Sequence, residues 1–290
     1  MSVTAIGDAR AKVSEEEWRL RVDLACCYRL VEHFGMADLV YNHITARLPY
    51  EVEGKEVFLI NGFGRHYTEI TASNLIRVDI DGKALDEDEY PVNGPGYVIH
   101  SAIHKARHDV GCIIHTHSRA GCAVAATEEG LIPLDQQSLQ FHQRVAYHEL
   151  EGIATDVDEQ DRLLADLGDK NVFILRNHGL LACGRTVAEA FRRIYYLERA
   201  CRLQVDVMSM GLKPVIPSKS VAEHTARQWE QGSAGQGTTE TIEWPALSRL
   251  MTRKDPSFAL WSIEIETASR LKPNRGWLCW RGSDSTAYRD

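Results

Sequence analysis

The chain has 290 residues and a formal net charge of −8, from 33 lysines and arginines against 41 aspartates and glutamates. This length can bury a large core, either in one domain with an extension or in at most two domains. The acidic balance argues against nucleic-acid partners, which require an excess of basic residues, and no apolar run is long enough to span a membrane, so we expect neither kind of partner.

The N-terminus and the cysteines predict a cytoplasmic protein. Residues 1–13 lack hydrophobic periodicity and the apolar core of a signal peptide, and we expect them to form a flexible arm. The seven cysteines are odd in number, include no Cys-x-x-Cys pair and sit mostly in apolar runs. This pattern is typical of buried, reduced thiols, and it argues against both a disulfide framework and a cysteine-rich metal site.

The first predicted elements carry a polar candidate residue, Asn42. The capping box Ser14-Glu-Glu-Glu17 predicts a helix that ends at Gly35. The alternating run 40–48 predicts a strand, and Asn42 lies on it. An asparagine there can cap a backbone turn or bind a substrate, and the residues alone leave both interpretations open.

A glycine-rich loop follows the next predicted strand, residues 57–60. The loop, Asn61-Gly-Phe-Gly64, permits positive φ and close approach of a ligand to the backbone. Arg65 and His66 come directly after it. A guanidinium here can bind a substrate carboxylate through two hydrogen bonds, although an arginine beside a glycine loop is also typical of a solvated surface.

The best metal-ligand candidates lie on two later strands. The β-branched run Cys112-Ile-Ile114 predicts a strand, and because side chains alternate along it, His115 and His117 project from one face. His178, at the end of the predicted strand 171–179, is the candidate third ligand. Imidazole nitrogens are common ligands of zinc and its first-row neighbours, yet chance His-x-His pairs and structural histidines also occur.

Another pair of histidines lies on the helix predicted for residues 95–107. His100 and His104 are spaced i, i+4 and therefore share one helix face, which is a spacing that can bind a metal ion. Because His115 and His117 make the better pair of ligands, we interpret the helix histidines as packing or supporting residues.

The composition changes in the last third of the chain. Thr186-Val-Ala-Glu189 is a second capping box and opens a long predicted helix. From residue 213 onward, prolines and glycines indicate a linker or a loop. The tail then holds three tryptophans, Trp261, Trp277 and Trp280. We therefore expect residues 213–290 to form an extension that packs on the core or on a neighbouring subunit.

Three segments together resemble the class II aldolase/adducin family. They are Tyr41-Asn-His-Ile-Thr-Ala-Arg47, His115-Thr-His117 and Asn177-His-Gly179. Further segments are most similar to the adducin-related branch, namely Ile60-Asn-Gly-Phe-Gly64, residues 69–79 and residues 99–104. The combination is specific, although each piece alone is weak. We expect residues 14–212 to form one metal-binding domain of this type.

The resemblance implies a fold, a cofactor and an assembly. It implies a three-layer α/β/α domain with a central, largely antiparallel sheet, whereas periodicity alone leaves a parallel doubly wound sheet open. It also implies that His115, His117 and His178 bind one divalent metal ion, with zinc as the first expectation and iron or manganese as alternatives. The family further implies a homo-oligomer, a homotetramer, that acts on a small-molecule substrate.

One position departs from the pattern of the family's enzymes. They use a glutamate nineteen residues before the first histidine of His-x-His, and this chain has Gly96 there. Gly94 and Pro95 stand where the phosphate-binding members have serines. The acid/base and part of a phosphate clamp are therefore absent, which argues against the ordinary aldol cycle on a sugar phosphate.

Three functions follow from these observations. The first is a divalent-metal-dependent lyase that cleaves a C–C bond, by aldol-type cleavage or decarboxylation, of a small non-phosphorylated carboxylate or hydroxy-carbonyl substrate. The second is a mononuclear non-haem iron oxygenase on the same histidines. The third is a non-catalytic adducin-like binding protein. We expect the first, with Arg65, His66 and Asn42 as catalytic residues; the resemblance implies that Asn42 holds the substrate.

Overall fold

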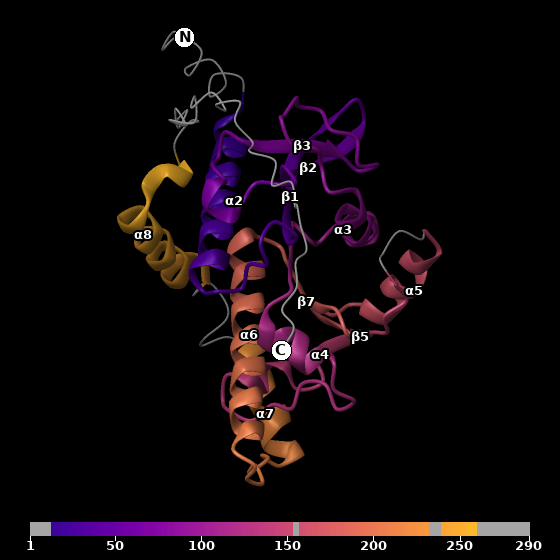
Figure 1. The fold of residues 1–290 in the computed structure, drawn as a ribbon, viewed down its shortest axis with the longest axis vertical. Helices are drawn as coiled ribbons and strands as arrows, with labels where there is room; N and C mark the ends of the chain where they lie inside the picture. The colour runs from indigo at the N-terminus through magenta and orange to yellow at the C-terminus, as the bar shows by residue number, and fades with distance from the viewer. Residues whose placement is uncertain (1–12, 153–156, 232–238, 260–290) are drawn as a thin grey trace, which may run out of the picture.

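A seven-stranded sheet forms the middle layer of the fold (Figure 1). The computed structural model describes residues 13–152, 157–231 and 239–259. The strand order is β3-β2-β1-β4-β7-β6-β5, and all neighbours are antiparallel except β5 and β6. This confirms the largely antiparallel sheet and excludes the doubly wound alternative. The strands are β1 (His43–Val52), β2 (Lys55–Asn61), β3 (Leu75–Asp79), β4 (Cys112–Thr116), β5 (Val145–His148), β6 (Val172–Leu175) and β7 (Gly179–Gly184).

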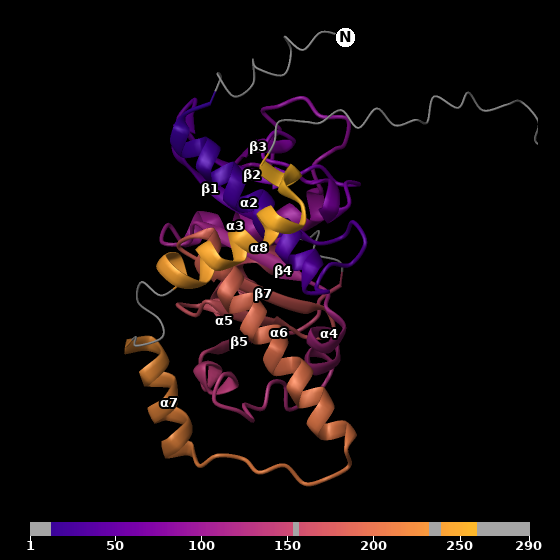
Figure 2. The same ribbon diagram turned by 90° about the vertical axis from the view of Figure 1, so that its left-hand side faces the viewer.

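Helices cover both faces of the sheet, which gives the three expected layers. Helices α2, α4 and α6 lie on one face, with α8 packed against α2, and helices α3 and α5 lie on the other (Figure 1). Figure 2 shows α6 running beyond the sheet to a long connection that leads to α7. The helices are α2 (Glu15–His33), α3 (Gly94–Ala106), α4 (Arg119–Ala125), α5 (Val157–Leu167), α6 (Val187–Ser209), α7 (Lys219–Gln231) and α8 (Trp244–Lys254), with short helical turns η2 (Tyr67–Glu69), η3 (Ser138–Phe141), η4 (Thr239–Glu243) and η5 (Pro256–Ala259).

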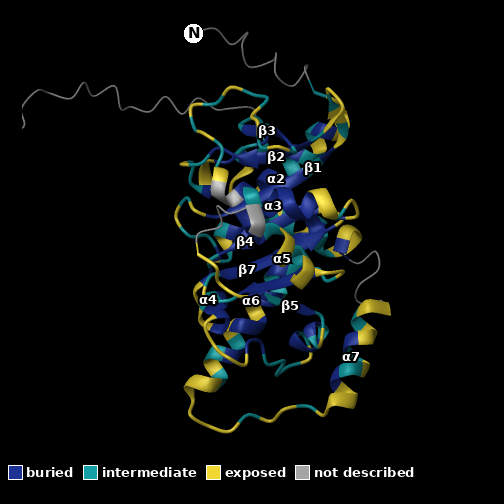
Figure 3. Cartoon of the chain, turned by 90° about the vertical axis from the view of Figure 1, so that its right-hand side faces the viewer, coloured by how far each residue is buried: buried dark blue, intermediate teal, exposed yellow. Residues whose placement is uncertain are grey.

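The alternation of side chains along β4 separates two cores. Ile114 packs with residues of α2 and α6, whereas Ile113 packs with residues of α3 and α5, and both side chains are fully buried. His115 points to the same face as Ile113, because successive strand side chains alternate. The middle of the sheet is covered on both sides (Figure 3). Residues 112–116 therefore form an unbroken buried run rather than a half-exposed one.

The predicted helix caps are present. The Ser14 hydroxyl accepts a hydrogen bond from the Glu17 N–H at 3.1 Å, and Gly35 follows the helix with a φ of +66°. The Thr186 hydroxyl accepts from the Glu189 N–H, also at 3.1 Å. Both side chains satisfy an N–H group that the helix itself cannot pair, which fixes the starts of α2 and α6.

Two predicted segments need correction. Residues 171–179, predicted as one strand, form β6, a turn and the first residue of β7, because Asn177 adopts a φ of +55° and the chain reverses there. The region after residue 213, predicted as a linker, contains α7. Only Ala222 and Ala226 of this helix are buried, so its apolar stripe is too narrow to stand out in the sequence.

Three further expectations concern the thiols, membrane-spanning helices and the C-terminal region. The six cysteines within the described ranges are free thiols, as expected, and none of the described helices is long and apolar enough to cross a membrane. Trp244, at the start of α8, is buried, and its indole N–H donates to the Asp23 carboxylate at 2.9 Å. Residues 1–12 of the predicted arm and the three tail tryptophans lie outside the described residues.

Candidate metal centre

The three predicted ligands meet at one end of the central strands. His115 lies on β4, His117 directly follows β4, and His178 lies in the turn between β6 and β7. The Nε2 atom of His117 is 2.8 Å from Nε2 of His115 and 3.0 Å from Nε2 of His178. One ring nitrogen from each of the three histidines lies within 4.8 Å of the other two. At this spacing the three nitrogens could bind one metal ion.

A close backbone contact brings His178 to the other two histidines. Asn177 holds the turn with its positive φ of 55°. A Cβ atom on Gly179 would lie 2.4 Å from the Thr116 carbonyl oxygen and 3.2 Å from Cδ2 of His117. Because no real Cβ fits 2.4 Å from a backbone oxygen, only glycine permits β7 to start this close to the end of β4.

Hydrogen bonds to the far nitrogens orient two of the rings. The Nδ1 atom of His115 is 2.9 Å from the Leu180 carbonyl oxygen, and Nδ1 of His117 is 3.1 Å from a carboxylate oxygen of Asp38. Both partners only accept, so each Nδ1 carries the proton and each Nε2 presents a lone pair. Two lone pairs 2.8 Å apart cannot hydrogen-bond to each other, but they can share a cation. This set of nitrogen donors fits a divalent metal ion.

Burial keeps the imidazoles of His115 and His178 neutral. It lowers the pKa of His115 well below the usual value, and the neighbouring His117 and His178 lower it further. Burial, followed by the effect of His117, lowers the pKa of His178 to about 4. Neutral imidazole is the form that binds a metal ion, so His115 and His178 are prepared to ligate at neutral pH without first losing a proton.

Buried polar side chains of β1 and α3 lie next to His115. The Thr45 hydroxyl lies 2.8 Å from Nδ1 of His100 and 2.9 Å from Nε2 of His104. The ring of His43 contacts that of His100, with centroids 4.1 Å apart, and lies 5.7 Å from the ring of His115. This geometry agrees with the interpretation of the helix histidines as supporting residues that connect α3 to β1.

Asn42 lies directly before β1 and is the chain neighbour of His43. Its side chain is buried, and neither its amide oxygen nor its amide nitrogen has a hydrogen-bond partner among the described residues. A buried amide without partners costs free energy. The Asn42 side chain therefore does not cap a backbone turn in this structure, and its role in binding a ligand stays a prediction.

Arg65 and His66 have partners of their own. The Nη2 atom of Arg65 donates to both carboxylate oxygens of Asp88, at 2.9 and 3.0 Å, and its guanidinium lies 4.6 Å from the ring centre of Tyr90. The His66 side chain caps η2 by accepting from the Thr68 N–H at 3.3 Å. Neither residue belongs to the three-histidine cluster, so their catalytic roles remain predictions.

Two residues of the centre were not predicted. Asp38 orients His117, and the thiol of Cys122 donates to the His178 carbonyl at 3.1 Å. Asp38 lies between α2 and β1, in a stretch without periodicity, and its partner is 79 residues away in the sequence. Only the folded sheet brings the two together, so the sequence offers no local signal for this contact.

The sequence is similar to those of known proteins. A family model described as "Class II Aldolase and Adducin N-terminal domain" matches residues 22–205. A Pseudomonas aeruginosa protein provisionally named as a class 2 aldolase is 46% identical over 254 residues, which cover 87% of this chain and 96% of that protein. Alpha-adducin of Rattus norvegicus is 39% identical over 251 residues, which cover 83% of this chain and 34% of adducin.

Solved structures share the fold. The crystal structure of an aldolase II superfamily protein from Pseudomonas syringae has a TM-score of 0.80 and 46% identity, covering 86% of this chain and 98% of that one. An L-fuculose 1-phosphate aldolase from Glaciozyma antarctica has a TM-score of 0.72 and 27% identity, covering 85% of this chain and 93% of that one.

Removal of the central ligand should empty the centre. Protein purified without chelator should contain one divalent metal ion per chain, and His117→Ala should lose it, because Nε2 of His117 approaches both other ligands. Elemental analysis by mass spectrometry measures the occupancy. His108→Ala is the control, since that side chain is 75% exposed. Full occupancy in the His117→Ala protein would rule out this assignment.

The Asp38 carboxylate should strengthen metal binding through His117. Asp38→Asn keeps the size of the side chain but removes the charge that orients the ring, and we expect metal affinity to fall roughly 10- to 100-fold. Competition against a chelator of known affinity measures the change. Asp109→Asn, at a carboxylate 59% exposed, should have no effect. Equal affinities of Asp38→Asn and wild type would show that the contact does not serve the metal.

Proposed function

Because the chain belongs to the class II aldolase and adducin family, we propose that it is a divalent-metal-dependent lyase that cleaves a carbon–carbon bond of a small non-phosphorylated carboxylate or hydroxy-carbonyl compound. The observation that carries this proposal is the convergence of three histidine nitrogens, two of them oriented by the Leu180 carbonyl and Asp38. His115, His117 and His178 would hold a divalent cation, zinc first and iron or manganese as alternatives, and the cation would supply a Lewis acid for a substrate oxygen.

Asn42 is the residue that we assign to substrate binding. Its buried amide can donate to a substrate hydroxyl or carbonyl oxygen and would then gain the partner that it otherwise lacks. The next residue, His43, pairs with His115 in the register of β1 and β4. Asn42 and the metal-binding histidines therefore lie at the same end of the sheet.

The first turn of α3 supports the substrate class. Gly94, Pro95 and Gly96 form this turn, and none of them has a carboxylate that could remove a carbon-bound proton or a hydroxyl that could bind a phosphate. Loss of CO₂ from a carboxylate breaks a C–C bond without that proton abstraction. Decarboxylation therefore stands beside aldol-type cleavage as the proposed reaction.

Arg65 is the residue that we assign to a substrate carboxylate. Its Nη2 holds Asp88, while its Nε has no hydrogen-bond partner among the described residues. A guanidinium has five N–H donors, so it can keep Asp88 and still bind a second carboxylate. His66, with an imidazole 40% exposed, is the neighbouring candidate for contact with the substrate.

A non-catalytic binding role is the second candidate function. The 39% identity to alpha-adducin favours it. The chain spans about a third of that protein, so the similarity does not assign the functions of the whole adducin to this chain. The oriented histidine nitrogens and the unpartnered Asn42 amide favour the lyase, because a pure scaffold gains nothing from either feature.

A screen of candidate substrates for cleavage decides between these two functions. Metal-loaded protein should cleave a non-phosphorylated keto or hydroxy acid, and L-fuculose 1-phosphate belongs in the same screen because a relative of known structure carries its name. Arg65→Lys should raise KM roughly tenfold for a substrate with a carboxylate, since lysine keeps the charge but loses the fork geometry. The carboxamide analogue of that substrate should show no such change.

Several results would contradict this assignment. Efficient cleavage of the sugar phosphate would refute the substrate class, and inactivity on every compound would favour the binding protein. An equal effect of Arg65→Lys on acid and carboxamide would show that the arginine only holds the loop. Arg162→Lys, at a surface ion pair with Glu151, is the matched control and should leave KM unchanged.

We also propose that the protein is a cytoplasmic homotetramer. Leu39 and Tyr41, which are 68% and 54% exposed, flank the residues of the centre, Asp38 and Asn42. Large apolar side chains in such a position favour a subunit contact that covers them. Light scattering should give four times the chain mass of 32.6 kDa, and a monomer at micromolar concentration would overturn the proposal.

A further inference from the structure

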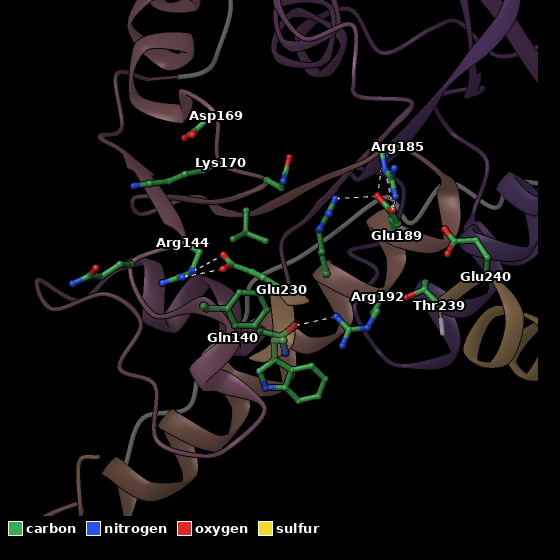
Figure 4. Close-up of a pocket in the computed structure, with 16 residues that line it drawn as sticks. Gln140, Arg144, Asp169, Lys170, Arg185, Glu189, Arg192, Glu230, Thr239 and Glu240 are labelled. Carbon is green, nitrogen blue, oxygen red and sulfur yellow. Dashed lines mark hydrogen bonds and ion pairs between the residues drawn. The ribbon is translucent and has the colours of Figure 1, made fainter. Parts of the chain in front are cut away.

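A large cleft lies at the end of the sheet opposite to the metal centre (Figure 4). It has a volume of about 930 Å³, and its lining includes Asn171 and Val172 at the start of β6 and Arg185 directly after β7. His178 lies at the other end of both strands. The six residues of β7, at about 3.3 Å each, therefore separate the cleft from the metal centre by roughly 20 Å.

Basic side chains outnumber acidic ones in this cleft. The basic ones are Arg144, Lys170, Arg185, Arg192 and Arg193, and the acidic ones are Asp169, Glu189, Glu230 and Glu240. Two further carboxylates outside the lining, Glu223 and Glu243, pair with Arg144 and Arg192. Five basic side chains around one cavity nevertheless offer several N–H donors to an anionic ligand.

The ion pairs of the cleft form two groups. Glu189 pairs with both Arg185, at 2.5 Å, and Arg193, at 3.5 Å. Glu230 pairs with Arg144 on the other side of the cleft, at 2.8 Å. Figure 4 shows these two groups of ion pairs facing each other across the cavity. One carboxylate therefore serves two arginines, and both keep N–H donors that Glu189 does not use.

Arg192 adds a guanidinium whose donors are only partly used. Its Nη1 donates to the Gln140 side chain at 3.0 Å, and its Nε lies 3.1 Å from Glu243. Its Nη2 has no hydrogen-bond partner among the described residues. The rings of Tyr196 and Trp229 lie 4.9 and 5.2 Å from the guanidinium carbon and hold the group at the cleft wall. An incompletely paired guanidinium beside a cavity suits an anionic ligand.

We propose that this cleft binds a phosphate-bearing small molecule, with its phosphate against Arg185 and Arg192. Arg185 directly precedes the capped start of α6, where the helix dipole also favours negative charge, and Arg192 lies in the second turn of the helix. Lys170 lines the same cleft and uses one of its three N–H donors for the Val145 carbonyl. The volume suits a ligand of the size of common metabolites, with Trp229 in the lining for an apolar part.

Titration calorimetry with inorganic pyrophosphate tests this site. Because a metal ion also attracts phosphates, the full chain is titrated both as wild type and as His117→Ala. Arg192→Gln and Arg185→Gln should each weaken binding roughly tenfold. Arg199→Gln is the matched control, because Arg199 lies on the same helix but pairs with Asp135 outside the cleft. Circular dichroism verifies that each variant folds.

The outcomes separate this site from the metal centre. Binding that survives His117→Ala and falls with Arg192→Gln supports the cleft. Binding that is lost in His117→Ala but kept in both arginine variants overturns it, as does a wild type that does not bind pyrophosphate or that binds citrate as well. If Arg192→Gln fails to fold, Arg185→Gln decides, since that side chain is 76% exposed. None of these results depends on lyase activity.

Discussion

The approach of β7 to the end of β4 is the constraint on which the candidate metal centre depends. Gly179 leaves no room for a side chain between its own Cα and the Thr116 carbonyl, and Asn177 reverses the chain just before it. A larger residue at position 179 would push the turn away and take His178 with it. The backbone of two strands thus sets the distance between ligands that are 61 residues apart in the sequence.

The parts of the site that follow a local rule were predictable from sequence. Strand alternation placed His115 and His117 on one face, and capping boxes placed the starts of two helices. The antiparallel sheet came from the family resemblance rather than from periodicity, because strands such as β4 are buried on both faces and read as uniform apolar runs. Asp38 was not predictable, since its contact with His117 exists only after the sheet has assembled.

The metal ligands and the residues of the first turn of α3 belong to separate elements. The ligands occupy the end of β4 and the β6–β7 turn, whereas Gly96 lies on a helix that packs on one face of the sheet. A substitution on α3 can therefore change which proton transfers are available without moving the histidines.

The weak attachment of α7 gives one chain two levels of stability. Only Ala222 and Ala226 of this helix are buried. The ion pairs of Arg144 with Glu223 and Glu230 are partly exposed to solvent, which screens them, so they add little stability. Detaching α7 should therefore need far less free energy than unfolding the sheet. Its amide hydrogens should exchange with solvent through local opening, whereas exchange of those in β4 and β7 should require global unfolding.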